Sequence, residues 1–265
     1  MRRKKKKITL STKILNHIFR WKVAYIFFVI LLILLYPVYV LDGQKWKFVS
    51  EYGIRLPTKY ELHGIDVSHH NENIDWQKVR HSTDDNVPIE FAVIKATEGQ
   101  DLKDQDFEKN WEGAKKVGLI RGAYHFYVPH VNPRLQAENF IESVKLESGD
   151  FAPVLDFELH GKGRRVRQNL KENIRIWLEI IENHYGIKPI IYTNRYVYSE
   201  YIKGEFDEYP LWMSDYDSPK LEGYDDANLL FWQHSHTGRL DGIRGNVDFN
   251  VFVGSKGQLN DICIQ

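Results

Sequence analysis

Two carboxylic acids stand two residues apart at the end of a short apolar run. The run reads APVLDFE over residues 152–158, and its acids are Asp156 and Glu158. Because side chains alternate between the two faces of a strand, both acids would point the same way, with Cα atoms ~6.6 Å apart. Such a pair can split its pKa values, so that one acid keeps a proton while the other is ionised. Glycosidic hydrolysis needs this combination, although a polar strand end or a metal-binding pair would carry the same residues.

Further polar residues follow other apolar runs. Asp66 ends the run GIDVS, and Asp248 lies in NVDFN, which we expect to close the last strand. In a closed barrel the first and last strands adjoin, so both acids could reach one mouth. Four carboxylates there would accept hydrogen bonds from sugar hydroxyls or bind a hard cation. The interleaved aromatic residues favour the sugar. The other polar residues at expected strand ends are Lys95, Glu98, His125, Tyr127, Tyr192, Asn194, Asp215, Tyr216, Gln233 and His234.

Metal and redox chemistry find little support in the sequence. His69 and His70 are adjacent, and successive residues seldom converge on one ion, so a loop or substrate-contact role is favoured over zinc. No His-Glu-x-x-His motif is present, and the single cysteine, Cys263, cannot form an intrachain disulfide. We expect no metal and no cofactor.

The elements that would position these residues alternate between strands and helices. Eight candidate strands cover residues 63–68, 91–99, 119–127, 152–158, 188–194, 210–216, 229–235 and 245–252. Helical periodicity separates the early ones, over 106–117, from 133 onwards, and over 166–185. The late connections are short and polar. The pattern predicts an α/β barrel of the TIM type, with complete βα units first and bare strands last.

The N-terminal residues differ from the remainder of the chain. Residues 1–22 carry nine basic residues and no acid, and residues 23–41 carry no charge. This pattern predicts a basic cytoplasmic tail, one transmembrane helix at 23–41, a stalk at 42–61 and a folded domain at 62–265 outside the cytoplasm, periplasmic or extracellular. A cleaved signal peptide is the alternative. Beyond residue 22 the chain has 27 basic and 36 acidic residues, which argues against binding to nucleic acid.

Taken together and in order, these motifs resemble glycoside hydrolase family 25, the N-acetylmuramidase-type lysozymes. The matching segments are GIDVSHHNENIDW, FAVIKATEG, APVLDFE, IIYTN, LWMSDY and NVDFN, which span about residues 62–254. The resemblance implies an irregular (β/α)5(β)3 barrel that cleaves the β-1,4 bond between N-acetylmuramic acid and N-acetylglucosamine in peptidoglycan.

The resemblance also implies roles for individual residues. Glu158 matches the general acid, Asp156 the carboxylate that assists it, and Asp66 and Asp248 the other two acids of the cleft. The residues expected to contact the sugar are Tyr124, Tyr192, Trp212, Asp215 and Gln233. We expect a monomer that binds peptidoglycan strands. A non-catalytic wall-binding protein and a metal-dependent deacetylase remain alternatives, and retention or inversion at the anomeric carbon stays open.

Overall fold

The computed structural model describes residues 10–43, 46–82, 87–159, 169–218, 221, 223–224 and 228–265. The chain forms two compact units, Met1–Lys47 and Phe48–Gln265. In the first unit, helix α1 (Leu10–Gly43) joins Arg20 and Lys22 to the apolar stretch that follows them. Among the described residues, no helix is long and apolar enough to cross a membrane. The predicted transmembrane helix at 23–41 is therefore not confirmed.

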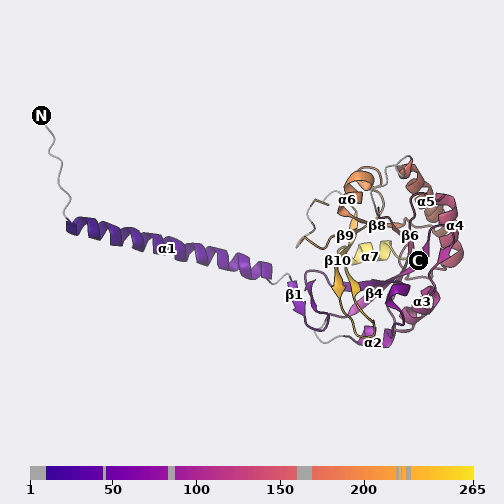
Figure 1. The fold of residues 1–265 in the computed structure, drawn as a ribbon, viewed down its shortest axis with the longest axis horizontal. Helices are drawn as coiled ribbons and strands as arrows, with labels where there is room; N and C mark the ends of the chain where they lie inside the picture. The colour runs from indigo at the N-terminus through magenta and orange to yellow at the C-terminus, as the bar shows by residue number, and fades with distance from the viewer. Residues whose placement is uncertain are drawn as a thin grey trace. The chain divides into compact units, whose positions relative to one another are not determined.

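Eight strands of the second unit close into a barrel (Figure 1). Around the barrel they follow the order β3 (Leu62–Val67), β11 (Val247–Phe252), β10 (Leu229–Gly238), β9 (Leu211–Ser214), β8 (Ile190–Asn194), β7 (Val154–Asp156), β6 (Ile120–Phe126) and β4 (Ile89–Glu98), with β3 pairing again to β4. Strand β11 runs antiparallel to both of its neighbours, and the other barrel pairs are parallel. The eight predicted strands and the α/β barrel are confirmed.

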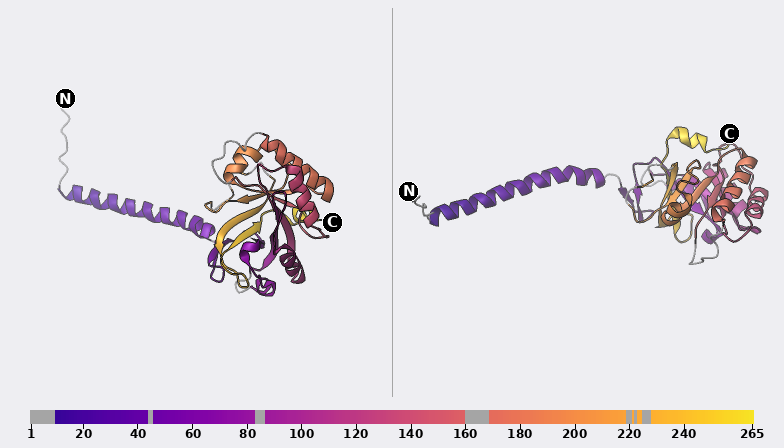
Figure 2. Two further views of the ribbon diagram at one scale, coloured as in Figure 1. Left: turned by 45° about the vertical axis from the view of Figure 1, so that its right-hand side comes forward. Right: turned by 90° about the horizontal axis from the view of Figure 1, so that it is seen from above.

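Helices cover the outside of the barrel between the earlier strands (Figure 2). They are α2 (Trp76–His81), α3 (Phe107–Lys116), α4 (Pro133–Ser143), α5 (Leu170–Tyr185) and the short α6 (Arg195–Val197), which continues into the π-helical turn η3 (Tyr198–Ile202). The described residues between β9 and β10, and all residues between β10 and β11, contain no helix. Complete units therefore come first and bare strands last, as the sequence predicts. Shorter elements are the 3-10 turn η1 (His69–Asn71), strand β5 (Leu102–Lys103) and helix α7 (Lys256–Asp261).

Helix α5 illustrates how the sequence specifies these outer elements. Its predicted apolar stripe is the face that packs on the barrel, since Leu170, Ile174, Trp177, Leu178 and Ile181 are all buried. Gly186 ends the helix at φ +73°, a left-handed conformation that glycine adopts without a steric cost. The predicted start at Val166 lies outside the described residues.

The inside of the barrel is filled by aromatic rings. Phe91, Phe151 and Phe231 meet edge to face, with ring centroids 5.2–5.6 Å apart. Below them, Ile262 is buried among the interior residues, and residues 262–264 pair through backbone hydrogen bonds with residues 149–152. Residues 262–264 therefore cover part of the N-terminal end of the barrel.

The segment predicted as a stalk is instead part of the folded unit from residue 48 onward. Strands β1 (Trp46–Val49) and β2 (Ile54–Pro57) form a small separate sheet. Tyr52 between them is 1% exposed, and its hydroxyl donates to the carbonyls of Ser82 and Val87 at 2.9 and 3.0 Å. This segment has no clear period because its apolar residues pack singly against the barrel, and the boundary at residue 62 is wrong.

Candidate active site

A cavity of about 280 Å³ opens at the C-terminal ends of the parallel strands. Asp66, Asp156, Glu158 and Asp248, the four acids singled out in the sequence, all line it. The other lining residues are Ser68, His70, Lys95, Tyr124, Phe126, Val154, Tyr192, Trp212 and Tyr216. The barrel therefore brings together acids that lie up to 182 positions apart in the sequence.

Asp156 and Glu158 reach the cavity from one strand end. Asp156 is the last residue of β7, and Glu158 follows in the loop. Burial raises the pKa of Asp156 well above its ordinary value, and the charges of Glu158 and Asp66 raise it further, while Lys95 lowers it. One oxygen of Asp156, Oδ1, is buried and has no hydrogen-bond partner among the described residues.

Asp66 and Asp248 face each other across two neighbouring strands. They are direct register partners in the antiparallel pair β3–β11. Asp248 lies at the start of β11 rather than at its end, because that strand runs in the opposite direction, so the prediction that Asp248 closes the last strand is wrong. Burial raises the pKa of Asp248 to about 8, helped by the charges of Asp66 and Glu158. This acid therefore keeps a proton near neutral pH.

Amide side chains from two strands hold Asp66. Its Oδ2 accepts hydrogen bonds from Gln233 Nε2 and Asn250 Nδ2, each at 2.7 Å. Burial raises the pKa of Asp66, these two bonds lower it, and the charge of Glu158 raises it again, to about 6. Asp66 thus loses its proton at a lower pH than Asp248 does.

Aromatic residues form much of the cavity wall, including the three predicted to contact a sugar. The rings of Tyr192 and Trp212 meet at 71° with centroids 4.8 Å apart. Tyr124 lies on β6, and its pKa is raised well above the ordinary value by burial and by the nearby acids. Tyr216 is 41% exposed at the rim and donates its hydroxyl hydrogen bond to Gln233 Oε1. Flat, partly polar walls of this kind suit the faces of sugar rings.

Two predicted contact residues lie behind the cavity wall rather than in it. Asp215 forms an ion pair with Arg195 at 2.6 Å and is not part of the lining. Gln233 is 1% exposed and reaches the site through Asp66 and the tyrosines. His125, one of the strand-end candidates, bonds Thr97 and Gln136 and stacks on Trp177, so it faces the surrounding helices.

Several lining residues were not assigned from the sequence. Lys95 ends up beside the acids, where its ammonium group lies 2.6 Å from Glu98 Oε2 and lowers the pKa of Asp156. The sequence pattern that could have identified Lys95 as a site residue is its position at an expected strand end. His70 and Ser68 follow β3 and lie at the rim, which agrees with the substrate-contact alternative for His70. Its neighbour His69 instead pairs with Asp104 at 2.6 Å.

A metal site is not found in the part of the chain that the structure describes. No group of three or more His, Cys, Asp or Glu side chains there could hold an ion. The paired acids instead provide proton donors and acceptors of different pKa, together with aromatic surfaces.

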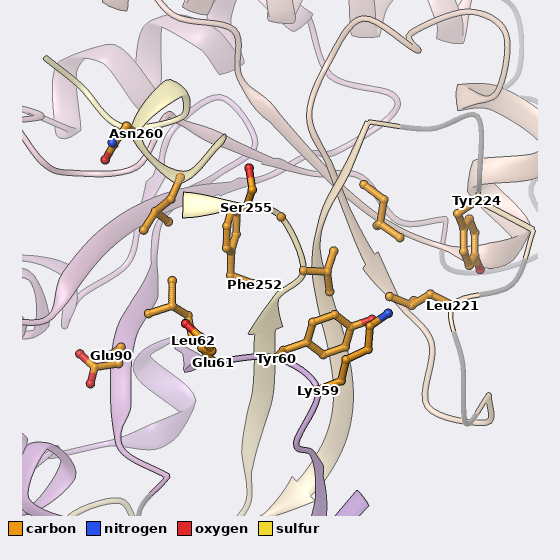
Figure 3. Close-up of a pocket in the computed structure, with 14 residues that line it drawn as sticks. Lys59, Tyr60, Glu61, Leu62, Glu90, Leu221, Tyr224, Phe252, Ser255 and Asn260 are labelled. Carbon is orange, nitrogen blue, oxygen red and sulfur yellow. The ribbon is translucent and has the colours of Figure 1, made fainter. Parts of the chain in front are cut away.

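A larger cavity, about 1030 Å³, lies at the opposite end of the barrel (Figure 3). It is bordered by the start of β3 at Leu62 and the end of β11 at Phe252. Its acids are Glu61 and Glu90, and Glu90 is paired with Arg80 at 3.4 Å. This cavity is larger, but it lacks the group of four acids that lines the smaller one.

Comparison with known proteins decides the family. A model described as glycosyl hydrolases family 25 matches residues 65–243. The chain belongs to this family. It is therefore a glycosidase, and the matched residues 65–243 include Asp66, Asp156 and Glu158.

Relatives of this family 25 chain agree with the assignment. An uncharacterized protein, YegX, from Escherichia coli K12 is 43% identical over 81% of this chain and 78% of its own length. Lysozyme M1 from Streptomyces globisporus is 32% identical over 75% of this chain and 70% of its own length. A family 25 glycosyl hydrolase from Bacillus anthracis superposes with a TM-score of 0.70 at 30% identity, covering 77% of this chain and 94% of that one.

Proposed function

We propose that this family 25 glycosidase is a muramidase that hydrolyses the β-1,4 bond between N-acetylmuramic acid and N-acetylglucosamine in peptidoglycan. Similarity to Lysozyme M1 and to an autolytic lysozyme from Clostridium acetobutylicum, 29% identical over 72% of this chain, supports the substrate. The alignment with the autolytic lysozyme covers 56% of that relative's own length, so it supports similarity of the barrel only. The observation that carries the proposal is the joint placement of Glu158 and Asp156 in one acid-lined cavity.

Glu158 is the general acid in this proposal. It gives its proton to the glycosidic oxygen while the bond from that oxygen to the anomeric carbon breaks. Positive charge then develops at the anomeric carbon, and an anionic cavity stabilises it. After water attacks, its proton returns to the Glu158 carboxylate, so acid and substrate atoms balance over one turnover.

Asp156 assists through the 2-acetamido group of the sugar. Its buried Oδ1 has no hydrogen-bond partner, and an acetamido N–H is a donor of the right kind. This bond would orient the acetamido oxygen for attack on the anomeric carbon, which forms an oxazolinium ion that water then opens. We therefore favour substrate assistance, with retention of configuration, over direct activation of water.

The proposed substrate also suggests where the domain acts. Peptidoglycan lies outside the cytoplasmic membrane, so we propose that residues 48–265 work there. The membrane anchor stays a sequence prediction. We also propose that a monomer suffices for cleavage.

The test is digestion of purified peptidoglycan by the full chain, followed by identification of the new reducing ends. We expect N-acetylmuramic acid at the reducing end, formed first as the retained anomer. Glu158→Gln should lower the rate by about 10²- to 10⁴-fold, while the isosteric control Glu200→Gln, at an exposed residue, should cleave normally. Binding without new reducing ends from the wild type would favour a non-catalytic wall-binding protein. An inverted anomer would rule out the acetamido route.

A further inference from the structure

We infer that Gln233 and Asn250 are positioning residues for cleavage: their amide N–H groups fix Asp66 Oδ2 as an acceptor and make Asp66 the carboxylate that carries negative charge in the cavity. This inference rests on the proposed glycosidase site and assigns a role to residues behind its wall. The inference also assigns different roles to two acids: Asp66 is the charged group and Glu158 is the proton donor.

The barrel places the two amides side by side. Gln233 on β10 and Asn250 on β11 are register partners, and both are at most 1% exposed. From there each donates to the same oxygen, Asp66 Oδ2, at 2.7 Å. Three neighbouring strands, β10, β11 and β3, thus contribute one residue each to a single contact point.

The orientation of the Asn250 amide follows from its other partner. Trp212 Nε1 lies 3.0 Å from Asn250 Oδ1, and an indole nitrogen can only donate. The amide oxygen must therefore face Trp212, and the NH₂ group must face Asp66. Because NH₂ cannot accept a hydrogen bond, Oδ2 has to be the acceptor.

Gln233 is oriented in a similar way from the opposite side. Its Oε1 accepts from the hydroxyl of Tyr192 at 2.8 Å and also from the hydroxyl of Tyr216. With the oxygen occupied by two donors, the NH₂ group is left for Asp66. A proton on Oδ2 would point at the hydrogens of both amide groups and disrupt these two bonds. The two bonds therefore favour the ionised form of Asp66.

No hydrogen bond contributes to the pKa shifts of Asp156 and Asp248. Burial raises the pKa of Asp248 to about 8 and that of Asp156 well above its ordinary value, whereas the two amide bonds hold the pKa of Asp66 to about 6. Of these three acids, Asp66 is the one whose ionised form is supported by two amide hydrogen bonds. Its charge is then available for the positive charge that develops at the anomeric carbon.

The direct test follows the ionisation of the acids themselves. Carboxyl ¹³C resonances of the full chain are titrated, with signals assigned by Asp66→Asn, Asp156→Asn and Asp248→Asn. In the wild type, Asp66 should ionise at the lowest pH of the three. The inference is overturned if Asp156 or Asp248 ionises first. This measurement needs no substrate, so it stands even if muramidase activity is not found.

Two variants remove one amide each, Gln233→Met and Asn250→Leu. In either folded variant the midpoint of Asp66 should rise by about one pH unit, because one bond to the charged form is lost. At pH 5, kcat/KM should then fall about tenfold more than at pH 8, with KM little changed. The matched control is Gln136→Met, an equally buried amide outside the site, which bonds His125 and the backbone of Val128. An unchanged Asp66 midpoint in both amide variants, or an equal rise in the control, would show a merely structural role.

Discussion

Replacing Asp248 by asparagine should stabilise the protein, and the gain should grow with pH. Asparagine has the same shape as aspartate, but it lacks the carboxyl group that is unfavourable to ionise in the folded protein. Burial, together with the charges of Asp66 and Glu158, raises the pKa of Asp248 from 3.8 to about 8. Between these two values the folded wild type holds a proton that the unfolded chain has released.

The sign of the effect follows from that difference in bound protons. A group whose pKa is higher in the folded state contributes stability that is complete below the unfolded pKa and is lost as pH rises to the folded pKa. Each pH unit in the window between 3.8 and about 8 therefore removes up to about 1.4 kcal/mol from the wild type. From pH 5 to pH 7 the loss reaches about 3 kcal/mol as an upper bound, since Asp248 keeps some contact with solvent.

Denaturant unfolding of the full chain at pH 5, 6 and 7 measures how the free energy of unfolding of each protein changes with pH. The free energy of unfolding of Asp248→Asn, relative to the wild type, should rise by about 1–3 kcal/mol over that range. Asp101→Asn is the matched control, since Asp101 is exposed in the turn between β4 and β5, and its difference should stay flat. A difference for Asp248→Asn that does not change with pH would refute the reasoning, because it would mean that the carboxyl titrates alike in both states.

Four further outcomes can be measured. Gly64→Ala should cost about 1–3 kcal/mol in unfolding free energy, because its new Cβ would lie 2.3 Å from the Phe91 ring; normal stability would show that the ring can move. Arg121→Leu should cost about 3–5 kcal/mol by leaving buried Asp150 without its ion pair, and adding Asp150→Asn should recover part of it. Asp215→Asn should cost about 1 kcal/mol and leave KM within about twofold, whereas a large rise in KM would restore it as a sugar contact. Treatment with a chelator should leave cleavage unchanged, and loss of activity would favour a metal-dependent hydrolase.

The sequence predicted the positions where strands end, and with them most of the site. Local periodicity and an apolar run are enough to place Asp156 and Glu158 at a strand end. The meeting of Asp66 with Asp248 followed from barrel closure alone, which brings the first strand beside the last. These predictions succeed because each depends on backbone pattern and on one rule of topology.

Other features depend on contacts that no local pattern carries. Nothing near Asn250 signals that its amide reaches Asp66, 184 positions away. The direction of β11 was also missed, because alternation is the same whichever way a strand runs. Tyr52 looked like part of a linker, since its burial is decided by Ser82 and Val87 rather than by its neighbours.

The pairing of β3 with β11 has a consequence for synthesis of the chain. Asp66 leaves the ribosome long before Asn250, and at ~5–20 residues per second the interval is ~10–40 s. Until β11 arrives, β3 lacks a neighbour on one side, and Asp66 has neither Asp248 opposite it nor Asn250 bound to it. A nascent chain that has not yet reached this strand contains Glu158 but not a complete cavity. Translation order alone thus keeps the proposed site incomplete until β11 has been made.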